Sequence, residues 1–344
     1  MVDLESMRKS NAKLGQYFTS CRPVAVFVGA TNGIGRNAVR SFARSTRGCK
    51  PRIYFVGRSH QRGHELKEEL VAINPDGEYD FISADVGEMA AVDDVCRQIM
   101  DREEYLNLLF MSQGTADHET ETSEKLRLLN AAVYYSKIRF AVNLLPLLKN
   151  APVLRRVVSV FAAGLEGKVV VDDLDGRKIS RLSHRDNLAS MLSLATVQLS
   201  EEVPEVSFVH NFPGAVESGL WESMPGFLGV IIRTLAWVLG RFWYMDPEEC
   251  GQRQIFMATS ARFPAATMGD DGNANGVDLL DGMIPAVSLN GNSSGAAYSV
   301  NEHADAISEK KADLLRRCKS DGTQDVVWRH TMETFKRITG KERL

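Results

Sequence analysis

The sequence predicts an α/β chain with a Rossmann-like, doubly wound parallel sheet of about seven strands, helices on both faces, and a C-terminal helical extension. Strand-like and helix-like runs alternate along most of its 344 residues. Strands joined through helices form parallel sheets by right-handed crossovers. The first such run, 24–29, is continuous and rich in β-branched residues, which is typical of a strand buried on both faces. It leads directly into a glycine-rich turn.

The remaining elements follow in order. We expect the strands at 24–29, 52–57, 79–85, 106–112, 155–160, 206–211 and 295–300. Apolar residues at helical spacing predict the connecting helices at 36–45, 61–73, 92–100, about 123–148 and 183–202. The stretch 265–296, rich in Gly, Asn and Asp, is expected to be a loop, and about 302–339 one or two surface helices.

These elements predict one domain with appendages. We expect an N-terminal extension over 1–21, a nucleotide-binding domain over 22–300 and the C-terminal helical extension over 301–344.

Composition excludes some classes of function. The chain is 44% hydrophobic and 25% charged, as expected for a globular protein with a full core. Its net charge of −3 gives no support to a nucleic-acid partner. The five cysteines show no metal-ligand spacing, so we expect reduced thiols and no metal site.

Targeting signals are also missing. The first residues lack the apolar core of a signal peptide, and the longest apolar stretch, 226–243, carries Arg233 and Arg241. That stretch is too short and too charged for a membrane span, so we expect a cytoplasmic protein without membrane association.

The glycine-rich turn predicts a phosphate site. Glycine allows a tight turn and a close approach of the backbone to phosphate oxygens, and the helix beyond offers free N–H groups with a partial positive charge. The residues expected to hold a nucleotide diphosphate here are Gly29, Thr31, Asn32, Gly33, Ile34 and Gly35.

The turn "GATNGIG" resembles that of the short-chain dehydrogenase/reductase superfamily, which reads Thr-Gly-x-x-x-Gly-Ile-Gly; Val28 stands for the threonine. The resemblance covers about 22–262. "PGAVES" (213–218) resembles the family's Pro-Gly-x-Val-x-Thr, and "MSQG" (111–114) stands at its Asn-Asn-Ala-Gly. It implies further cofactor contacts: to adenine from Asp85 and Val86, and elsewhere from Ser112, Gly114, Pro213, Gly214, Val216 and Ser218.

The end of the second strand favours NADP over NAD. An acidic residue there binds a ribose 2′-hydroxyl and repels a 2′-phosphate. This chain has Arg58 and no carboxylate, and a guanidinium can bind a phosphate through two hydrogen bonds. The alternative is that Arg58 is a solvated surface arginine.

The family's usual proton-transfer residues are missing. The resemblance implies a Tyr-x-x-x-Lys pair on the helix before the sixth strand, but none of the eight tyrosines has a lysine four residues later. Arg185 and Ala189 fall at these positions. Ala162 falls at the family's serine position, and Val133 at its asparagine position.

Four residues are candidate substitutes. His184 adjoins the empty tyrosine position and titrates near neutral pH, although a surface histidine in a loop is the alternative. Tyr134 and Tyr135 lie beside the missing asparagine, but core tyrosines with bonded hydroxyls are an alternative. Lys137 could reach a phosphate or the substrate, or be a solvated lysine. His210 is expected to be a core histidine.

The substrate is expected to be small and apolar. The stretch 219–244 falls where the superfamily carries its substrate lid, and its four large aromatic residues, Trp221, Phe227, Trp237 and Phe242, favour a bulky apolar ligand. An interfacial helix is the alternative. Whole-chain similarity to a filamentous-fungal branch suggests a polyketide-like or aromatic intermediate of secondary metabolism.

The favoured function is therefore an NADP(H)-dependent oxidoreductase of the short-chain type. Two alternatives stay open because the catalytic residues are missing. One is a non-redox dehydratase, isomerase or cyclase on the same fold, and the other is an NADP(H)-binding module without catalysis. Members of the superfamily commonly form dimers or tetramers through the helices that flank strands four and five, which implies a homo-oligomer here.

Overall fold

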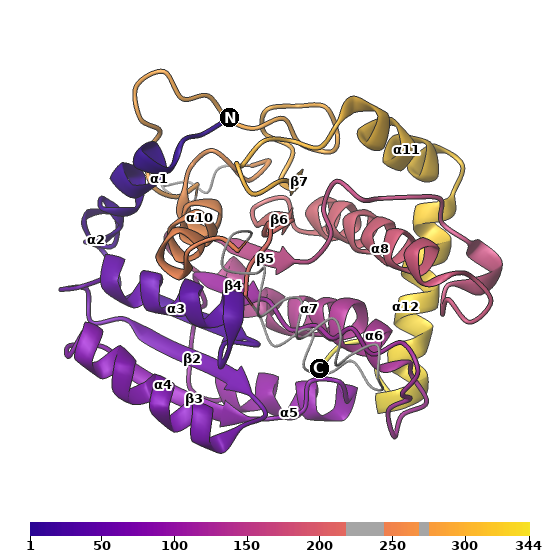
Figure 1. Cartoon of the computed structure of the whole chain (residues 1–344), viewed down its shortest axis with the longest axis horizontal. Coiled ribbons are helices and arrows are strands. Elements are labelled where there is room, and N and C mark those ends of the chain that lie inside the picture. Colours follow the sequence, from indigo (N-terminus) through magenta and orange to yellow (C-terminus); the bar gives the residue numbers. More distant parts are fainter. Residues whose placement is uncertain (218–243, 268–274) are drawn as a thin grey trace.

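A seven-stranded parallel sheet forms the centre of the molecule (Figure 1). The computed structural model describes residues 1–217, 244–267 and 275–344. The strand order is β3-β2-β1-β4-β5-β6-β7, and every pairing is parallel. The strands are β1 (Val24–Val28), β2 (Arg52–Gly57), β3 (Glu78–Ser83), β4 (Leu108–Met111), β5 (Arg156–Val160), β6 (Ser207–Asn211) and β7 (Ala297–Val300). The predicted fold class is confirmed.

Helices cover both faces because successive side chains of each strand point to opposite sides. Val24, Val26 and Val28 join one hydrophobic core, whereas Ala25 and Phe27 join the other. The first core lies against α5 (Met89–Met100), α7 (Ser136–Lys149) and α8 (Arg181–Glu202). The second lies against α1 (Leu4–Asn11), α2 (Leu14–Tyr17), α3 (Gly33–Ser45), α4 (His60–Ile73) and α10 (Pro247–Thr259).

One predicted helix begins later than expected. The pattern predicted a helix from about residue 123, but the chain becomes helical at α6 (Leu128–Asn130). Lys125 has φ 65°, which no helix accommodates, and a turn closes when the Thr122 N–H donates to Leu126 O at 2.8 Å. A π-helical turn, η1 (Ala131–Tyr135), then leads into α7. Such π-turns insert an extra residue and occur often at functional sites.

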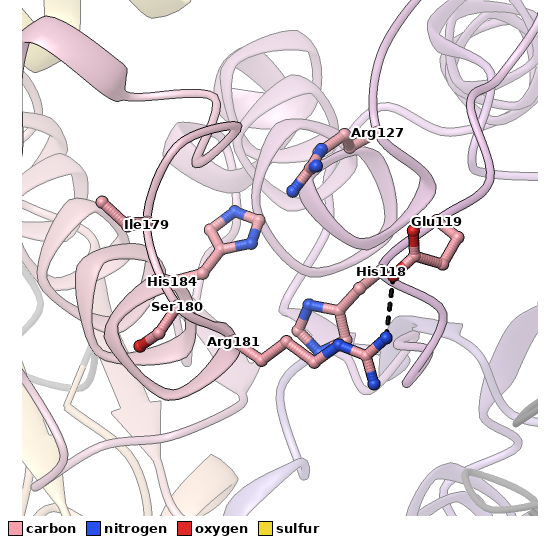
Figure 2. Close-up of a pocket in the computed structure, with 7 residues that line it drawn as sticks. All are labelled: His118, Glu119, Arg127, Ile179, Ser180, Arg181 and His184. Carbon is pink, nitrogen blue, oxygen red and sulfur yellow. Dashed lines mark hydrogen bonds and ion pairs between the residues drawn. The ribbon is translucent and has the colours of Figure 1, made fainter.

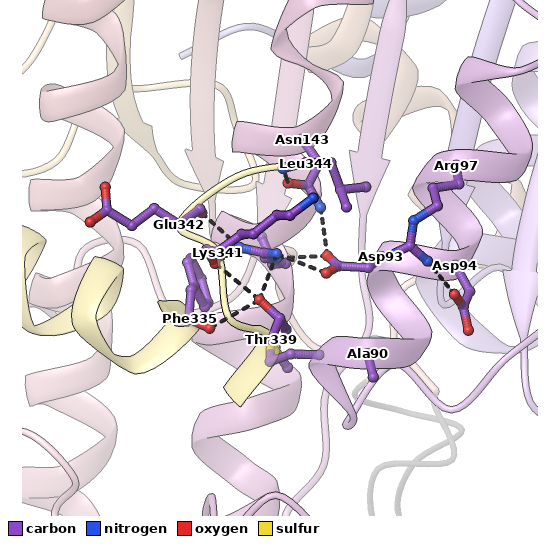
Figure 3. Close-up of polar contacts among 12 residues, drawn as sticks. Ala90, Asp93, Asp94, Arg97, Asn143, Phe335, Thr339, Lys341, Glu342 and Leu344 are labelled. Atoms are coloured by element: carbon purple, nitrogen blue, oxygen red, sulfur yellow. Dashed lines mark hydrogen bonds and ion pairs between the residues drawn. The ribbon is translucent and has the colours of Figure 1, made fainter. Parts of the chain in front are cut away.

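The C-terminal extension consists of α11 (Glu309–Ser320) and α12 (Thr323–Thr339). It was expected at the surface, but Val327 and Phe335 are fully covered and join the first core. The main chain after α12 is also fixed. Arg139 of α7 donates to the carbonyl oxygens of Lys341 and Glu342 at 3.1 and 2.6 Å (Figure 3). The extension therefore covers part of the helical layer over β4 and β5.

No helix among the described residues is long and apolar enough to cross a membrane. The predicted lid, with its four large aromatic residues, lies outside the described residues except for Tyr244. Residues 275–296 contain no helix or strand, as predicted for that part of the loop.

Candidate nucleotide site and active site

From β1 the sheet is extended in both directions, with β2 and β3 on one side and β4 to β7 on the other. Ligands of open α/β sheets bind at the carboxyl ends of the strands beside such a switch point, which here lies between β1 and β4. The glycine turn follows β1 at this point. Gly29 and Gly33 have φ +77° and +53°, the region that favours glycine. A Cβ on Gly35 would lie 2.5 Å from Gly29 O, so only glycine lets α3 begin this close to β1.

The residues between these glycines fix the turn. The Asn32 side chain caps α3 by accepting the Gly33 N–H at 2.8 Å. Thr31 packs on Gly57 at the end of β2, where a Cβ would lie 2.5 Å from its methyl carbon. Ile34 is half-buried against the second core. The next main-chain N–H groups at the start of α3 have no intrahelical acceptors, as in any helix, and remain suited to an anion.

The end of β4 lies directly beside this turn. Ser112 Oγ is 3.3 Å from Gly29 O, and a Cβ on Gly29 would lie 2.6 Å from Gln113 N. Gln113 is almost buried and its amide donates to Ser136 Oγ at 3.1 Å. Gly114 is exposed and lies opposite Val133. Sequence reasoning assigned no role to Gln113 or Ser136, since neither matches the family motif.

The residues predicted to contact the adenine and the 2′-phosphate also lie at the carboxyl ends of the strands. Arg58 follows β2 and is 70% exposed, with its Nη1 3.9 Å from Asp85 Oδ2. Asp85 follows β3 and accepts the Gly87 N–H at 3.0 Å, and Val86 beside it is nearly buried. An exposed ion pair of this length holds the guanidinium weakly, so Arg58 can turn toward an added phosphate.

The predicted contacts after β6 are only partly described. Pro213 is half-buried, and Gly214 has φ +77°. Val216 forms a bridge with Met245. Ser218 lies outside the described residues.

The positions of the missing catalytic residues carry groups unsuited to proton transfer with a substrate. Ala189 lies one turn after Arg185 on α8 and is fully buried. The Arg185 guanidinium is paired with Asp186 at 2.7 Å. Ala162, after β5, and Val133, in η1, are buried and apolar.

The two tyrosine candidates contact α12 instead of the glycine turn. Tyr134 Oη is 2.7 Å from Thr331 Oγ1, and Tyr135 Oη is 2.8 Å from His330 Nε2. Burial raises the pKa of both phenols. Their hydroxyls are thus bonded within the core, as the alternative interpretation predicted.

Lys137 is fully buried, so the alternative of a solvated lysine is wrong. Its ammonium donates to Val160 O at the end of β5 and lies 5.7 Å from the centre of the Phe161 ring. Removal from water lowers the pKa of Lys137 to about 7, because burial disfavours the charged form.

A buried polar cluster surrounds this end of β5. It comprises Lys137, Glu166, Ser193, His210 and Ser299. Glu166 Oε1 accepts from the hydroxyls of Ser193 and Ser299 at 2.9 and 2.6 Å.

His210 lies in this cluster and is a core histidine, as expected. Its Nδ1 is 2.9 Å from Ser193 Oγ, and its ring stacks on Phe161. Burial, together with the charge of Lys137, lowers the pKa of His210 to about 3. Sequence reasoning missed Glu166, Ser193 and Ser299. Ser193 could have been found from the sequence, because it lies one helical turn after Ala189, which stands at the family's lysine position on α8.

His184 is neither in a loop nor at the surface. It lies in the first turn of α8, fully covered, beside a pocket of about 260 Å³ (Figure 2). Burial and the nearby Arg127 guanidinium lower the pKa of His184 to about 4. The pocket is lined from two loops and the amino end of α8, and not by the glycine turn.

Comparison with known proteins identifies relatives over nearly the whole chain. The family model for short chain dehydrogenase matches residues 23–171. The chain is 34% identical to "Oxidoreductase AN1596" of Emericella nidulans, over 96% of this chain and 97% of that protein. It is 30% identical to "Short-chain dehydrogenase/reductase SAT2" of Stachybotrys chartarum, over 99% of both chains.

Solved structures share the fold at low sequence identity. L-sorbose reductase from Gluconobacter frateurii, complexed with NADPH and L-sorbose, has a TM-score of 0.53 at 17% identity, covering 77% of this chain and 99% of that one. The RhlG/NADP complex of Pseudomonas aeruginosa has a TM-score of 0.51 at 16% identity, covering 76% and 95%.

Proposed function

The chain belongs to the short-chain dehydrogenase/reductase family, and from that premise we propose that it is an NADP(H)-dependent oxidoreductase acting on an apolar intermediate of fungal secondary metabolism. Family membership confirms the oxidoreductase class that the sequence predicted. One observation carries the choice of cofactor: the glycine turn lies beside the end of β4, with the exposed Arg58 guanidinium at the end of β2. The names of similar structures that bind NADP or NADPH support it.

The residues present fit the cofactor. The N–H groups at the start of α3 would hold the diphosphate, Arg58 would bind the 2′-phosphate, and Asp85 would contact the adenine. Ser112, Gly114 and the turn after β6 would border the nicotinamide half. NADPH, when bound, supplies a hydride to the substrate.

The proton source has to differ from the family's tyrosine. Of the four candidates, Lys137 is supported best, because its ammonium reaches the end of β5. A pKa of about 7 leaves this group able to give up a proton at neutral pH.

The cofactor proposal is tested by titrating the purified protein with NADPH and NADH and following fluorescence. We expect NADPH to bind more tightly, and Arg58→Ala to weaken NADPH binding about tenfold or more while leaving NADH unchanged, because a charge-assisted phosphate contact is lost. Arg97→Ala is the control, since Arg97 is an exposed arginine on α5 paired with Asp94. Equal affinity for the two nucleotides, or no binding of either, contradicts the proposal.

A non-redox enzyme is the second candidate, and Arg185, Ala189 and Ala162 at the usual catalytic positions favour it. Turnover that continues without nucleotide would establish a dehydratase, isomerase or cyclase. Tight NADPH binding with no turnover of any candidate intermediate would instead establish a binding module.

Three further features belong to the same proposal. We divide the chain at 1–21, 22–300 and 301–344, with the substrate lid at 219–244, and we place the protein in the cytoplasm. We also propose that the protein forms a homo-oligomer. In the structure, however, α12 packs over α5, α7 and α8. A dimer formed through those helices would therefore have to include α12.

A further inference from the structure

The pocket at the amino end of α8 contains buried polar groups that have no partner. His184 is fully covered, and within the described part of the chain neither of its ring nitrogens has a hydrogen-bond partner. The same holds for Nδ1 of His118, whose ring centre lies 5.9 Å away. Buried polar atoms are nearly always paired, so the pocket is suited to a ligand that supplies hydrogen bonds.

The His184 ring occupies space that the backbone leaves free at Gly176. Gly176 has φ +66°, and a Cβ there would lie 2.1 Å from the ring carbon Cδ2 of His184. The Arg127 guanidinium donates to Gly176 O at 2.8 Å and so fixes the loop that covers the ring. Figure 2 shows the His184 ring close to both Arg127 and His118.

The charge of the lining favours a monoanion. Arg127 and Arg181 contribute two positive charges and Glu119, which accepts from Arg181 at 2.8 Å, contributes one negative charge. The amino end of the 22-residue helix α8 adds a partial positive charge. Burial and the Arg127 charge lower the pKa of both histidines, which disfavours their protonated forms.

The carboxylates near the histidines are already bonded elsewhere. Asp117 accepts the N–H groups of Glu119 and Thr120, and Asp173 accepts those of Arg177 and Lys178. Asp175 accepts from the Tyr135 hydroxyl. None of the three lines the pocket.

We propose that this pocket binds a carboxylate group, and that this carboxylate is the polar end of an otherwise apolar substrate. Only the second part rests on the proposed function. The imidazole N–H groups and the guanidiniums would donate to the carboxylate oxygens, and the Ile179 side chain would contact the apolar body. A pocket of about 260 Å³ is smaller than a typical drug-sized site, so it would hold one end of a larger molecule.

Benzoate is the probe, with benzamide as its neutral analogue. We expect benzoate to shift the NMR signals of His118 and His184 among the seven histidines, and to bind about tenfold or more tightly than benzamide. Because the bound anion favours the protonated imidazoles, benzoate affinity should rise as the pH falls from 7 toward 5.

Arg181→Gln and Arg177→Gln form a matched pair. Each arginine is exposed and pairs with a loop glutamate, Arg181 with Glu119 and Arg177 with Glu121, but only Arg181 lines the pocket. We expect R181Q to weaken benzoate binding about tenfold and R177Q to change it less than about twofold. H184F, which keeps an aromatic ring without nitrogens, should abolish binding.

Three results would overturn the carboxylate site: no shift of either histidine signal at saturating benzoate, equal binding of benzamide, or equal losses in R181Q and R177Q. An NADPH titration of the same samples reports the proposed function separately. If NADPH fails to bind but benzoate binds as described, the carboxylate site stands and only its link to a redox substrate is lost.

Discussion

The carboxyl ends of β1 to β4, here called the first edge, and the carboxyl ends of β5 and β6, here called the second edge, are built in different ways. At the first edge the backbone decides the structure: Gly29, Gly33 and Gly35 are required by their φ angles or by close approaches. At the second edge side chains decide it, through a buried cluster that includes Lys137, Glu166 and His210. This chain therefore has a glycine turn of the family's type, while other residues stand at the family's usual catalytic positions.

The largest expected effect concerns the helical layer that covers the sheet, where α5 and α7 meet. Asp93 of α5 accepts two N–H groups of Arg139 at 2.7 and 2.8 Å and one of Asn143 at 2.8 Å, and all three residues are buried (Figure 3). Asp93→Asn leaves the Arg139 charge buried without its partner. We expect the free energy of unfolding, measured with urea, to fall by about 3–5 kcal/mol.

The neighbouring residue provides the control for Asp93. Asp94 pairs with Arg97 on the surface of the same helix, with 68% of its side chain exposed. Asp94→Asn should change stability by less than about 1 kcal/mol. If the two variants lose equal stability, the buried Asp93–Arg139 pair contributes no more than an exposed pair.

Lys137 gives the second edge a pH dependence. Its pKa is lowered from 10.5 to about 7 in the folded protein, so between these values the unfolded chain binds more protons. Stability should therefore rise with pH across that window, by about 1.4 kcal/mol per pH unit from this residue, and be lost as the pH falls toward 7.

Lys137→Met tests that slope by urea unfolding at pH 7 to 10. The variant should lose the lysine's contribution to the slope and be no less stable than the parent at pH 7, because a buried charge is gone. Lys149→Met, at the half-exposed end of the same helix, is the control and should keep the slope. If the stability of Lys137→Met changes with pH as steeply as that of Lys149→Met, Lys137 is not the titrating group.

A smaller effect tests the backbone rule at the first edge. In Gly35→Ala the new Cβ would lie 2.5 Å from Gly29 O, and a backbone atom cannot move aside easily. We expect a loss of about 1–3 kcal/mol in stability, together with weaker NADPH binding. In Gly114→Ala the nearest atom is 3.6 Å from the Cβ, so stability should change by less than about 0.5 kcal/mol. If the two variants are equally stable, the close backbone approach at Gly35 does not determine the structure of the first edge.

By itself the sequence determined the fold class, the positions of the seven strands to within two residues, and the glycine turn. These features depend on local signals: continuous apolar runs, helical spacing, and glycine where other residues cannot fit. It also determined an absence, since no folding can create a Tyr-x-x-x-Lys pair that the chain does not contain.

Only the tertiary structure decided where the remaining polar side chains go. Lys137 and His184 could each be solvated on sequence grounds, yet both are buried, because residues distant in the chain cover them. Glu166, Ser193 and Ser299 come from three separate segments and meet only when β5, α8 and β7 pack together. Burial and pairing depend on such long-range contacts, and these leave no periodic trace in the sequence.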